Sequence, residues 1–492
     1  MKMKIRSIYV LIAILLSSPF SCSDWMELIP PDGLIREEFW KTKEDVQAVI
    51  MGAYQSFAEM DEKLFKFGEI RADMVEADYN VSGNERNIME SNIYPDNSYC
   101  NWADFYKVIN YCNEVILNAP LVQNVDDTFS DFLLQGYLSE AYFLRSLAYF
   151  YLVRVYRDVP YVIEPTESDD ADVYVSKMDG DELLELVRQD LEVYRTYATI
   201  DGYPTETELK GRATKAAYDA LLADISLWLF DYDAVITHVS NIEANVTYVL
   251  MPSDKWFELY SPGNSLESIY EFQFDDNLNQ SNSLYGLTQR NSHQYDPSET
   301  ALEMFALDYE SLERKRGEDN SIAKYGEGEY IIWKYVGAQG DGKTTRTGTE
   351  QSSANWIIYR LADVMLMKAE ALSQLGRYDE ARNIINEIRE RASVAPVSPA
   401  LSMSAFEDAI MEERSLELAY EGKRWFDLMR MGRRNDYARK SKLIEIIVQN
   451  VPSTQKRILA IKLTNPLGWY LPIFEDELER NKNLVQNPYY EN

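Results

Sequence analysis

The stretch W-I-I-Y-R-L-A-D-V-M-L-M-K-A-E-A-L-S-Q-L-G-R-Y-D-E-A-R-N-I-I-N-E-I-R-E-R-A, residues 356–392, decides the fold of this chain. Apolar residues recur at helical spacing between Leu361 and Leu375, which predicts an amphipathic helix. Gly376 follows at the place where the end of a helix needs a residue that tolerates positive φ. A second amphipathic helix is predicted over residues 378–392, and two helices joined by so short a turn must pack antiparallel.

The spacing of small residues is that of a tetratricopeptide-type hairpin. Ala369 and Ala381 would let the two helices approach closely. The same pattern recurs in residues 211–242, where the matching residues lie 146 positions earlier. Phe230 stands there in the place of Gly376, so we expect the second turn to differ from the first. The repeat indicates a scaffold of stacked helical hairpins and says nothing of catalysis.

A third predicted helix begins at a capping box formed by Ser404 and Glu407. It continues as E-E-R-S-L-E-L-A-Y-E-G-K-R-W-F-D-L-M-R over residues 412–430. This segment, together with R-L-A-D-V-M-L-M-K-A-E-A-L over residues 360–372, resembles the C-terminal signature of the SusD/RagB family. Members of that family are outer-membrane nutrient-binding lipoproteins of Bacteroidota.

The charged residues of this third helix need partners, because an unpaired buried charge is costly. Arg414 and Glu417 are one turn apart, as are Arg424 and Asp427, and we expect each arginine to pair with its neighbour. Glu417 and Glu421 could instead form a carboxylate pair like that of a glycosidase. The arginines are placed to neutralise these carboxylates, so we favour the structural interpretation.

The composition argues against several classes of function. The chain has 492 residues and a net charge of −32, and this excess of acid repels nucleic acid and anionic lipid. Its apolar fraction of 46% is enough for a large core. With His238 and His293 as the only histidines, triads and zinc sites built on histidine are almost excluded. We therefore expect no metal site and no cofactor.

Residues 1–21 are typical of a targeting segment, with a positively charged start and a short apolar run. The run is too short to span a bilayer, and no other segment approaches transmembrane length. Cys22 follows directly, which predicts lipidation of this cysteine, although Pro19 stands where the usual lipobox has leucine. The alternative is a secretory peptide cleaved nearby, without a role for Cys22. Cys100 and Cys112 lie too far apart along their expected helix to form a disulfide, so we predict that both are free.

The resemblance covers nearly the whole mature chain. We expect a single SusD-like domain, residues 22–492, that is mostly α, with tetratricopeptide-like hairpins forming a scaffold and with irregular loop-rich insertions and minor β structure. Phe474 and Tyr489 replace the proline and glycine usual in the closing segment of the family, and Arg157 replaces a glycine after a long apolar helix. The expected parts are scaffold hairpins near 101–160, 211–242 and 357–393, a loop-rich insertion at 245–355 and the C-terminal signature at 404–492.

Two motifs that suggest a ligand fail when their context is considered. The run from Gly337 to Thr344 satisfies the phosphate-loop pattern G-x-x-x-x-G-K-[ST], but the residues after it are poor helix formers. The run from Asp275 resembles a cation-binding loop, but Gln280 and Gly286 replace the glycine and glutamate of an EF-hand. Incidental calcium binding there stays open as an alternative, with no ligands that the sequence identifies. No nucleophile–base arrangement stands out, so we expect a binding protein and not an enzyme.

The candidate ligand contacts come from two irregular segments, 76–100 and 275–300, which are rich in tyrosine and asparagine. Aromatic faces hold the C–H patches of sugars, while amides and arginine bond their hydroxyls. Each such residue, taken alone, is more often a packing or surface residue. Trp102 is assigned to the core, because it lies on the apolar face of its predicted helix. The candidate residues are Tyr79, Arg86, Asn87, Tyr94, Tyr99, Asn277, Asn279, Tyr285 and Tyr295.

The resemblance implies a lipid-anchored protein of the outer-membrane surface that captures oligosaccharide and delivers it to a TonB-dependent, SusC-like transporter. Alternatives are capture of peptide or glycopeptide by the same route, a surface glycoside hydrolase, and an interaction scaffold without a small ligand. An aromatic-lined groove formed by the two segments would favour glycan capture. A flat, charged surface there would count against it.

Overall fold

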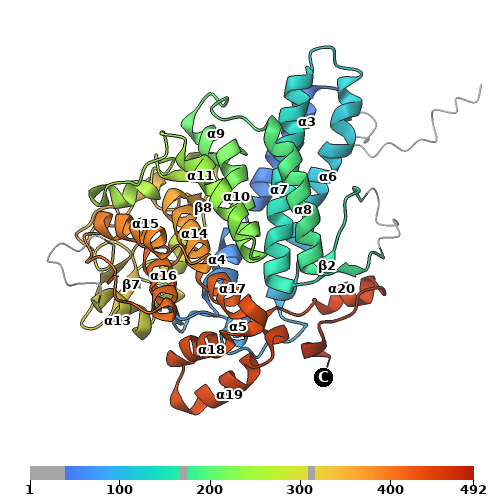
Figure 1. Ribbon diagram of the computed structural model, residues 1–492. Helices are drawn as coiled ribbons and strands as arrows, with labels where there is room; N and C mark the ends of the chain where they lie inside the picture. The colour runs from blue at the N-terminus through green and yellow to red at the C-terminus, as the bar shows by residue number, and fades with distance from the viewer. Residues whose placement is uncertain (1–38, 167–173, 308–315, 492) are drawn as a thin grey trace, which may run out of the picture.

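The computed structural model describes residues 39–166, 174–307 and 316–491. Within them the protein is mostly helical with a few short strands, which confirms the predicted fold class (Figure 1). The predicted signal peptide and Cys22 lie outside the described residues. Among the described helices, none combines the length and the apolar character that crossing a membrane requires.

Four long helices form a tall bundle, on the right in Figure 1. The longest of them is buried from Leu134 onwards over most of its length, because the other three pack around it. It ends at Arg157, which adopts a φ of +70°, in the left-handed region that favours glycine. The four helices are α3 (Lys43–Ala58), α6 (Ala103–Gln123), α7 (Asp131–Tyr156) and α8 (Gly180–Tyr194).

Two helical hairpins lie beside this bundle, as the repeated pattern predicts (Figure 1). One consists of α10 (Lys215–Trp228) and α11 (Tyr232–Glu243), and the other of α14 (Leu361–Gln374) and α15 (Tyr378–Arg391). The first helix of each hairpin is apolar and buried over most of its length, and α11 packs against α14. The two copies therefore stack on each other, as repeats must to bury a shared core.

The expectation that the two hairpins turn differently is wrong. Phe230 has a φ of +65° and Gly376 a φ of +77°, so both occupy the left-handed region. The amide of Asp231 donates to the carbonyl of Ser226 at 2.8 Å, and the amide of Arg377 makes the equivalent bond at 2.8 Å. These bonds close the helix end in the same way in both copies, and they hold Phe230 in a conformation that costs about 1–2 kcal/mol for a residue with a Cβ.

The remaining described helices lie around the two hairpins and the foot of the bundle (Figure 1). They are α4 (Asp61–Glu69), α5 (Gly83–Met89), α9 (Glu206–Gly211), α12 (Leu284–Thr288), α13 (Glu299–Leu307), α16 (Met403–Glu417), α17 (Arg424–Tyr437), α18 (Lys440–Gln449), α19 (Ser453–Leu463) and α20 (Glu475–Arg480). Short 3₁₀ turns are η2 (Ser98–Cys100), η3 (Arg195–Tyr197), η4 (Ser253–Leu259), η5 (Asp276–Leu278), η6 (Gly348–Glu350), η7 (Pro466–Trp469) and η8 (Pro488–Tyr490).

The strands form four separate antiparallel pairs in the described residues. Six of these eight strands have only two or three residues, which agrees with the minor β structure that was expected. The pairs are β1 (Val75–Ala77) with β5 (Tyr295–Pro297), β2 (Val159–Pro160) with β3 (Lys177–Met178), β4 (Ser268–Phe272) with β8 (Trp356–Arg360), and β6 (Ile322–Lys324) with β7 (Tyr330–Ile332).

The helix caps are only partly as predicted. Helix α16 is capped by Ser402, whose side chain accepts a hydrogen bond from the amide of Ala405, so the capping box predicted at Ser404 is wrong. Ser404 lies inside the first turn of the helix. A capping box that the sequence reading missed joins Ser82 and Glu85 at the start of α5, within a segment expected to be irregular.

The predicted ion pairs within the C-terminal signature are wrong in their partners. The guanidinium of Arg414 lies 2.8 Å from Asp427 and does not pair with Glu417. Arg424 pairs instead with Asp73, at 2.7 Å. Both arginines are almost fully buried, so each carboxylate partner comes from the segment that packs against it and not from the adjacent turn.

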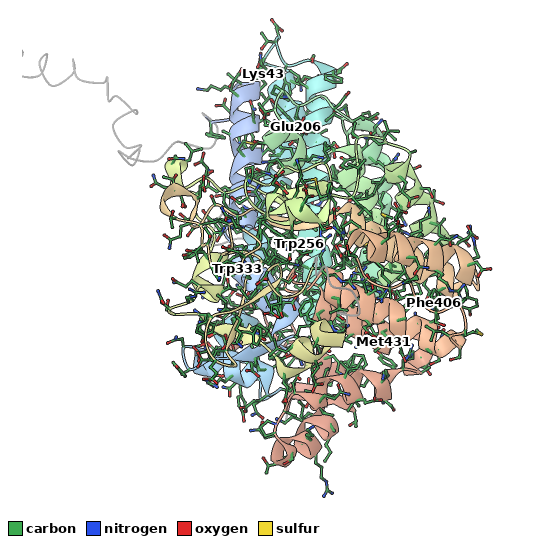
Figure 2. All side chains as sticks on the ribbon, turned by 90° about the vertical axis from the view of Figure 1, so that its left-hand side faces the viewer. Lys43, Glu206, Trp256, Trp333, Phe406 and Met431 are labelled. Atoms are coloured by element: carbon green, nitrogen blue, oxygen red, sulfur yellow. The ribbon has the colours of Figure 1, made fainter. Side chains whose placement is uncertain are left out.

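Glu417 and Glu421 belong to a buried cluster of charges. Both are at most 3% exposed, and Arg360 binds both of them. Burial alone would raise the pKa of Glu421, but Arg360 and Lys334 lower it to about 2. Lys334 follows the buried Trp333 of the insertion, labelled near the middle of Figure 2. The structural interpretation of this carboxylate pair is therefore the correct one, because no substrate reaches it.

The two cysteines of the mature chain that the structure describes are free, as predicted. Both are buried, and burial raises the pKa of each thiol. Trp102 is 3% exposed and belongs to the core, also as predicted.

Candidate functional site

The two candidate segments, 76–100 and 275–300, meet in the folded protein. Strands β1 and β5 place Val75 opposite Pro297 and Ala77 opposite Tyr295. Beyond the strands, the amide of Asp78 donates to the carbonyl of Gln294 at 2.9 Å. The pairing joins segments that lie about two hundred residues apart in the sequence, so their side chains share one surface.

Two of the candidate tyrosines are strongly exposed on this part of the chain. Tyr79 is 88% exposed and Tyr94 is 62% exposed, although large aromatic side chains are usually covered. Arg86 is also exposed, and its guanidinium donates to the backbone carbonyl of Asp78 at 2.8 Å, next to Tyr79. Asn87 is half-buried, and its carbonyl accepts from the amide of Asn92 at 2.7 Å.

Tyr295 does not belong to the ligand surface. It is fully buried, and its hydroxyl donates to a carboxylate oxygen of Glu85 at 2.8 Å. Burial alone would raise the pKa of Glu85, but its bonds to Lys66, Ser82 and Tyr295 lower it to about 2. Tyr295 is therefore a structural residue that fixes β5 to α5, which corrects the prediction made from its position in a tyrosine-rich segment.

Tyr99 and Tyr285 are half-buried and have partners within the protein. The hydroxyl of Tyr99 accepts a hydrogen bond from the ammonium group of Lys66 at 2.7 Å. Tyr285 packs against a small apolar cluster that includes Trp333. These two rings therefore offer a ligand only part of their surface.

The predicted residues of the segment that begins at Asp275 lie at a polar hollow or beside it. Asn277 is exposed and lines a hollow of about 660 Å³ together with Asn264, Gln273 and Asn355. The Oδ1 atom of Asn264 is buried there without a hydrogen-bond donor. Asn279 is exposed and takes the left-handed conformation that ends the η5 turn. The hollow offers amide groups and little aromatic surface.

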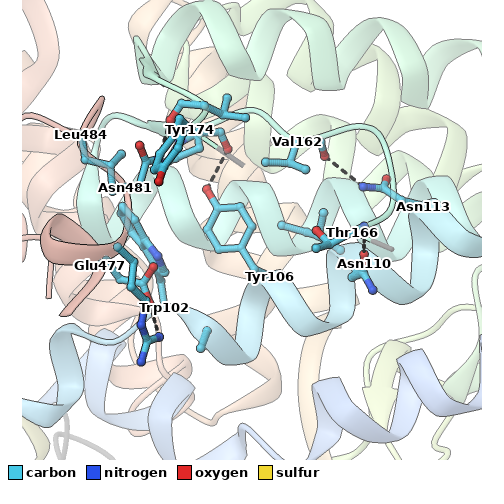
Figure 3. Close-up of a pocket in the computed structure, with 15 residues that line it drawn as sticks. Trp102, Tyr106, Asn110, Asn113, Val162, Thr166, Tyr174, Glu477, Asn481 and Leu484 are labelled. Carbon is cyan, nitrogen blue, oxygen red and sulfur yellow. Dashed lines mark hydrogen bonds and ion pairs between the residues drawn. The ribbon is translucent and has the colours of Figure 1, made fainter. Parts of the chain in front are cut away.

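A cavity with aromatic walls lies outside the two predicted segments (Figure 3). Its volume is about 550 Å³. It is enclosed by α6, by α20 and by the chain on either side of residues 167–173. The hydroxyl of Tyr106 donates to the carbonyl of Pro160 at 2.7 Å, which fixes the ring in the wall. The lining residues with aromatic or polar side chains are Trp102, Tyr106, Asn110, Asn113, Thr166, Tyr174, Glu477, Arg480 and Asn481.

This cavity could not be predicted from the sequence, because its walls come from three distant parts of the chain. The side-chain oxygen of Asn110 accepts a hydrogen bond from the backbone amide of Thr166 at 2.8 Å (Figure 3). The side-chain amide of Asn113 donates to the backbone carbonyl of Val162 at 3.1 Å. Tyr174 is about half exposed at its rim. The chemistry of the lining, aromatic rings beside amides and a carboxylate, suits a polar ring-shaped ligand.

A group of titratable residues next to Tyr79 was also missed. Asp78, His293 and Asp296 lie together, and the ring of His293 packs edge-on against Tyr325 with 5.8 Å between centroids. Burial, together with the neighbouring carboxylates, raises the pKa of Asp296 to about 6. The spacing of His293 and Asp296, three residues apart, was the available signal.

The run from Gly337 to Thr344 does not form a phosphate loop. The amides of Lys343 and Thr344 donate to the carboxylate of Asp341 at 2.9 and 3.2 Å, so a carboxylate of the protein already occupies them. A 3₁₀ turn, η6, is the next helical element, in place of the α-helix that a phosphate site needs. The phosphate-loop pattern is therefore a coincidence of sequence.

Comparison with known proteins assigns both halves of the chain. A family model described as "SusD family" matches residues 231–490, and one described as "Starch-binding associating with outer membrane" matches residues 24–227. The chain is 28% identical to SusD-like protein P38 of Formosa agariphila, over 99% of this chain and 100% of that protein. It is 24% identical to a SusD-like protein of Bacteroides ovatus, over 83% of this chain and 79% of that protein.

Solved structures share the fold. A SusD superfamily protein from Bacteroides thetaiotaomicron superposes with a TM-score of 0.73 at 21% identity, covering 92% of this chain and 99% of that chain. A structure described as a laminarin-binding SusD-like protein gives a TM-score of 0.69 at 21% identity, covering 91% and 99%.

Proposed function

The chain belongs to the SusD family, and we propose that it is a cell-surface lipoprotein that captures a neutral oligosaccharide and passes it to a SusC-like, TonB-dependent transporter. Proteins of this family bind ligands and do not catalyse reactions. A family model that matches the first half of the chain names starch and the outer membrane in its description. The oligosaccharide, the lipid anchor and the transporter are the parts of the proposal that go beyond family membership.

The observation that carries the proposal is the exposed ring of Tyr79 at the junction of the two irregular segments. A tyrosine that is 88% exposed gains little by packing within its own chain. It stands beside polar groups that can bond hydroxyls, including the side chain of Arg86. A flat aromatic face beside such groups is the arrangement that sugars need.

The charge of the protein selects among glycans. A net charge of −32 repels polyanionic polysaccharides, so neutral glucans are the first ligands to test. Laminarin and starch are two such polymers, and they are named in the descriptions of a similar structure and of a matching family model. Peptide capture, the second candidate, would be favoured if a panel of peptides bound and the glucans did not.

A glycan array with hydrolysis measured in the same wells tests the proposal. We expect binding without turnover, and we expect Tyr79→Ala to weaken binding at least about fivefold, since one stacked ring contributes about 1–3 kcal/mol. Tyr197→Ala is the matched control, because that ring is 48% exposed on a distant 3₁₀ turn. Turnover of the glycan, or equal effects of the two variants, would contradict the proposal.

The aromatic cavity is the second candidate position for the ligand. Arg480 lines it, is largely exposed, and makes only long ion pairs of 3.7 and 3.9 Å. Arg480→Ala therefore changes the cavity with little effect on folding. If Arg480→Ala loses glycan binding while Tyr79→Ala binds glycan like the wild type, the ligand binds in the cavity and not on the Tyr79 surface.

The lipid anchor needs its own experiment. When the full chain is expressed in a Bacteroidota host, Cys22→Ser should move the protein from the membrane fraction to the soluble fraction. A variant that stays with the membrane, or a wild-type N-terminal peptide without added lipid mass, would contradict lipidation of Cys22.

A further inference from the structure

Three side chains from the two irregular segments converge on one point next to Tyr79. His293 precedes β5, Asp296 is in β5, and Asp78 follows β1. The Nε2 atom of His293 lies 3.0 Å from Oδ1 of Asp296 and 3.6 Å from Oδ2 of Asp78. One atom of each residue lies within 4.8 Å of the other two, and His293 is only 6% exposed.

The environment of His293 determines which ring nitrogen carries the hydrogen. Its Nδ1 atom lies 3.2 Å from the backbone carbonyl of Gln289. A carbonyl can only accept, so Nδ1 carries the hydrogen. In the neutral ring, Nε2 then turns its lone pair towards the carboxylates of Asp78 and Asp296. Three electron-rich atoms that face one another require a positive charge between them, and either a proton on Nε2 or a bound metal ion supplies it.

A second observation supports a ligand at this point. The Oδ1 atom of Asp296 is buried, and a neutral His293 with its hydrogen on Nδ1 has none to donate to it across the 3.0 Å from Nε2. A buried carboxylate oxygen without a donor costs about 1–3 kcal/mol or more, so native proteins seldom leave one. The carboxylate of Glu76 lies opposite Asp296 across the strand pair and adds to the negative potential. These carboxylates attract a cation.

The ligand set and the distances identify the class of cation. Zinc binds imidazole nitrogen at about 2.0–2.1 Å and carboxylate oxygen at about 2.0–2.2 Å, which puts tetrahedral ligand atoms about 3.4 Å apart. The observed distances of 3.0 and 3.6 Å lie on either side of that value. Calcium and magnesium prefer ligand sets made only of oxygen. A carbonyl on the far nitrogen of the ring is also the usual support of a metal-binding histidine.

We infer that Asp78, His293 and Asp296 form a site for a divalent transition metal, with zinc as the preferred ion, that ties β1 to β5 next to Tyr79. The remaining position of a tetrahedral site is left for water. The inference departs from the sequence expectation of no metal site, which rested on the number of histidines and did not consider one histidine with two aspartates. It does not rest on glycan capture, because ion binding and glycan binding are read separately.

The other histidine provides an internal contrast. The Nδ1 atom of His238 lies 2.9 Å from Asp219, and its Nε2 atom lies 3.2 Å from Glu192. Each of its nitrogens faces a different carboxylate, so three ligand atoms do not converge on one point there as they do at His293. His238→Gln is therefore the matched control for His293→Gln.

The test is calorimetric titration of ZnCl₂ into the mature chain after treatment with EDTA, with MgCl₂ and CaCl₂ titrated in parallel. We expect one zinc ion per chain and no comparable heat from magnesium or calcium. His293→Gln and Asp296→Asn should each weaken zinc binding by more than about 100-fold, which is the upper range for loss of a supporting group alone. His238→Gln should bind zinc like the wild type.

Thermal unfolding in EDTA and in zinc keeps the inference testable if a variant folds poorly. The wild-type Tm should rise with zinc concentration, and the Tm of His293→Gln should not respond to zinc. The inference is overturned if the wild type binds no zinc, if His293→Gln binds zinc as tightly as the wild type, or if calcium or magnesium binds and zinc does not.

Discussion

Replacing Arg360 by methionine should lower the free energy of unfolding by about 3–5 kcal/mol at pH 7, because it leaves buried carboxylates without their shared cation. Arg360 is fully buried and donates five hydrogen bonds to Glu267, Glu417 and Glu421, at 2.7–3.0 Å. Methionine fills most of the same space, so the loss reflects charge more than a cavity. Lys334 remains near Glu421 after the substitution and limits the loss.

Equilibrium unfolding in urea at pH 7 and pH 5 measures both the loss and its origin. In the wild type, burial would raise the pKa of Glu421, but Arg360 and Lys334 lower it to about 2. A carboxylate with a depressed folded pKa contributes its stability above its unfolded pKa of about 4.3 and loses it as the pH falls towards 2. Without Arg360 the folded pKa rises, so the carboxylate takes up a proton on folding and the penalty shrinks from pH 7 to pH 5.

The control for this experiment is Arg377→Met. Arg377 pairs only with Glu380, and the two side chains are 44% and 56% exposed. Loss of such a pair costs about 0–1 kcal/mol. The reasoning is refuted if Arg360→Met costs less than about 1 kcal/mol, or if its penalty is the same at pH 5 as at pH 7.

Four further substitutions test the structure at three points. Tyr295→Phe should destabilise the protein by about 1–3 kcal/mol, since it removes a hydrogen bond to the charged Glu85. It should leave glycan binding unchanged, and weaker glycan binding by a folded variant would restore Tyr295 to the ligand surface. Gly376→Ala should cost about 1–2 kcal/mol from backbone strain alone, because a Cβ there meets no atom within 4 Å; a neutral result in urea unfolding would contradict its positive φ. In urea unfolding, Ser402→Ala should lower the free energy of unfolding by about 1 kcal/mol, and Ser404→Ala should leave it almost unchanged. The reverse order would show that Ser404 caps α16, as the sequence predicted.

The sequence was sufficient where the structure is decided over a few residues. The apolar stripes of α14 and α15 depend on neighbours within one or two turns, and the structure contains both helices. The turn at Phe230 was mispredicted because the preference of glycine for positive φ was treated as a requirement. Hydrogen bonds of the closing turn outweigh a strain of about 1–2 kcal/mol.

The sequence was insufficient where partners are distant. Arg424 was assigned a partner three residues away, but its carboxylate is Asp73, 351 positions earlier. Composition likewise could not separate Tyr79, which is exposed, from Tyr295, which is buried, because both lie in tyrosine-rich irregular chain. Three-residue strands such as β1 carry too little alternation to be recognised, so the contact between the two candidate segments could not be foreseen.

The buried charges explain how a helical frame can carry an irregular surface in a fixed position. Glu267 and Lys334 belong to the insertion, Arg360 opens the second hairpin, and Glu417 and Glu421 belong to the C-terminal signature. An apolar contact tolerates sliding, but a buried charge that loses its partner costs several kcal/mol, so this cluster admits one register between insertion and frame. Irregular chain held in one register loses less conformational entropy on binding, which favours affinity. Under the proposed function, the charged residues of the signature contribute to recognition indirectly, because they hold the insertion in place, and the ligand contacts fall to exposed side chains such as Tyr79.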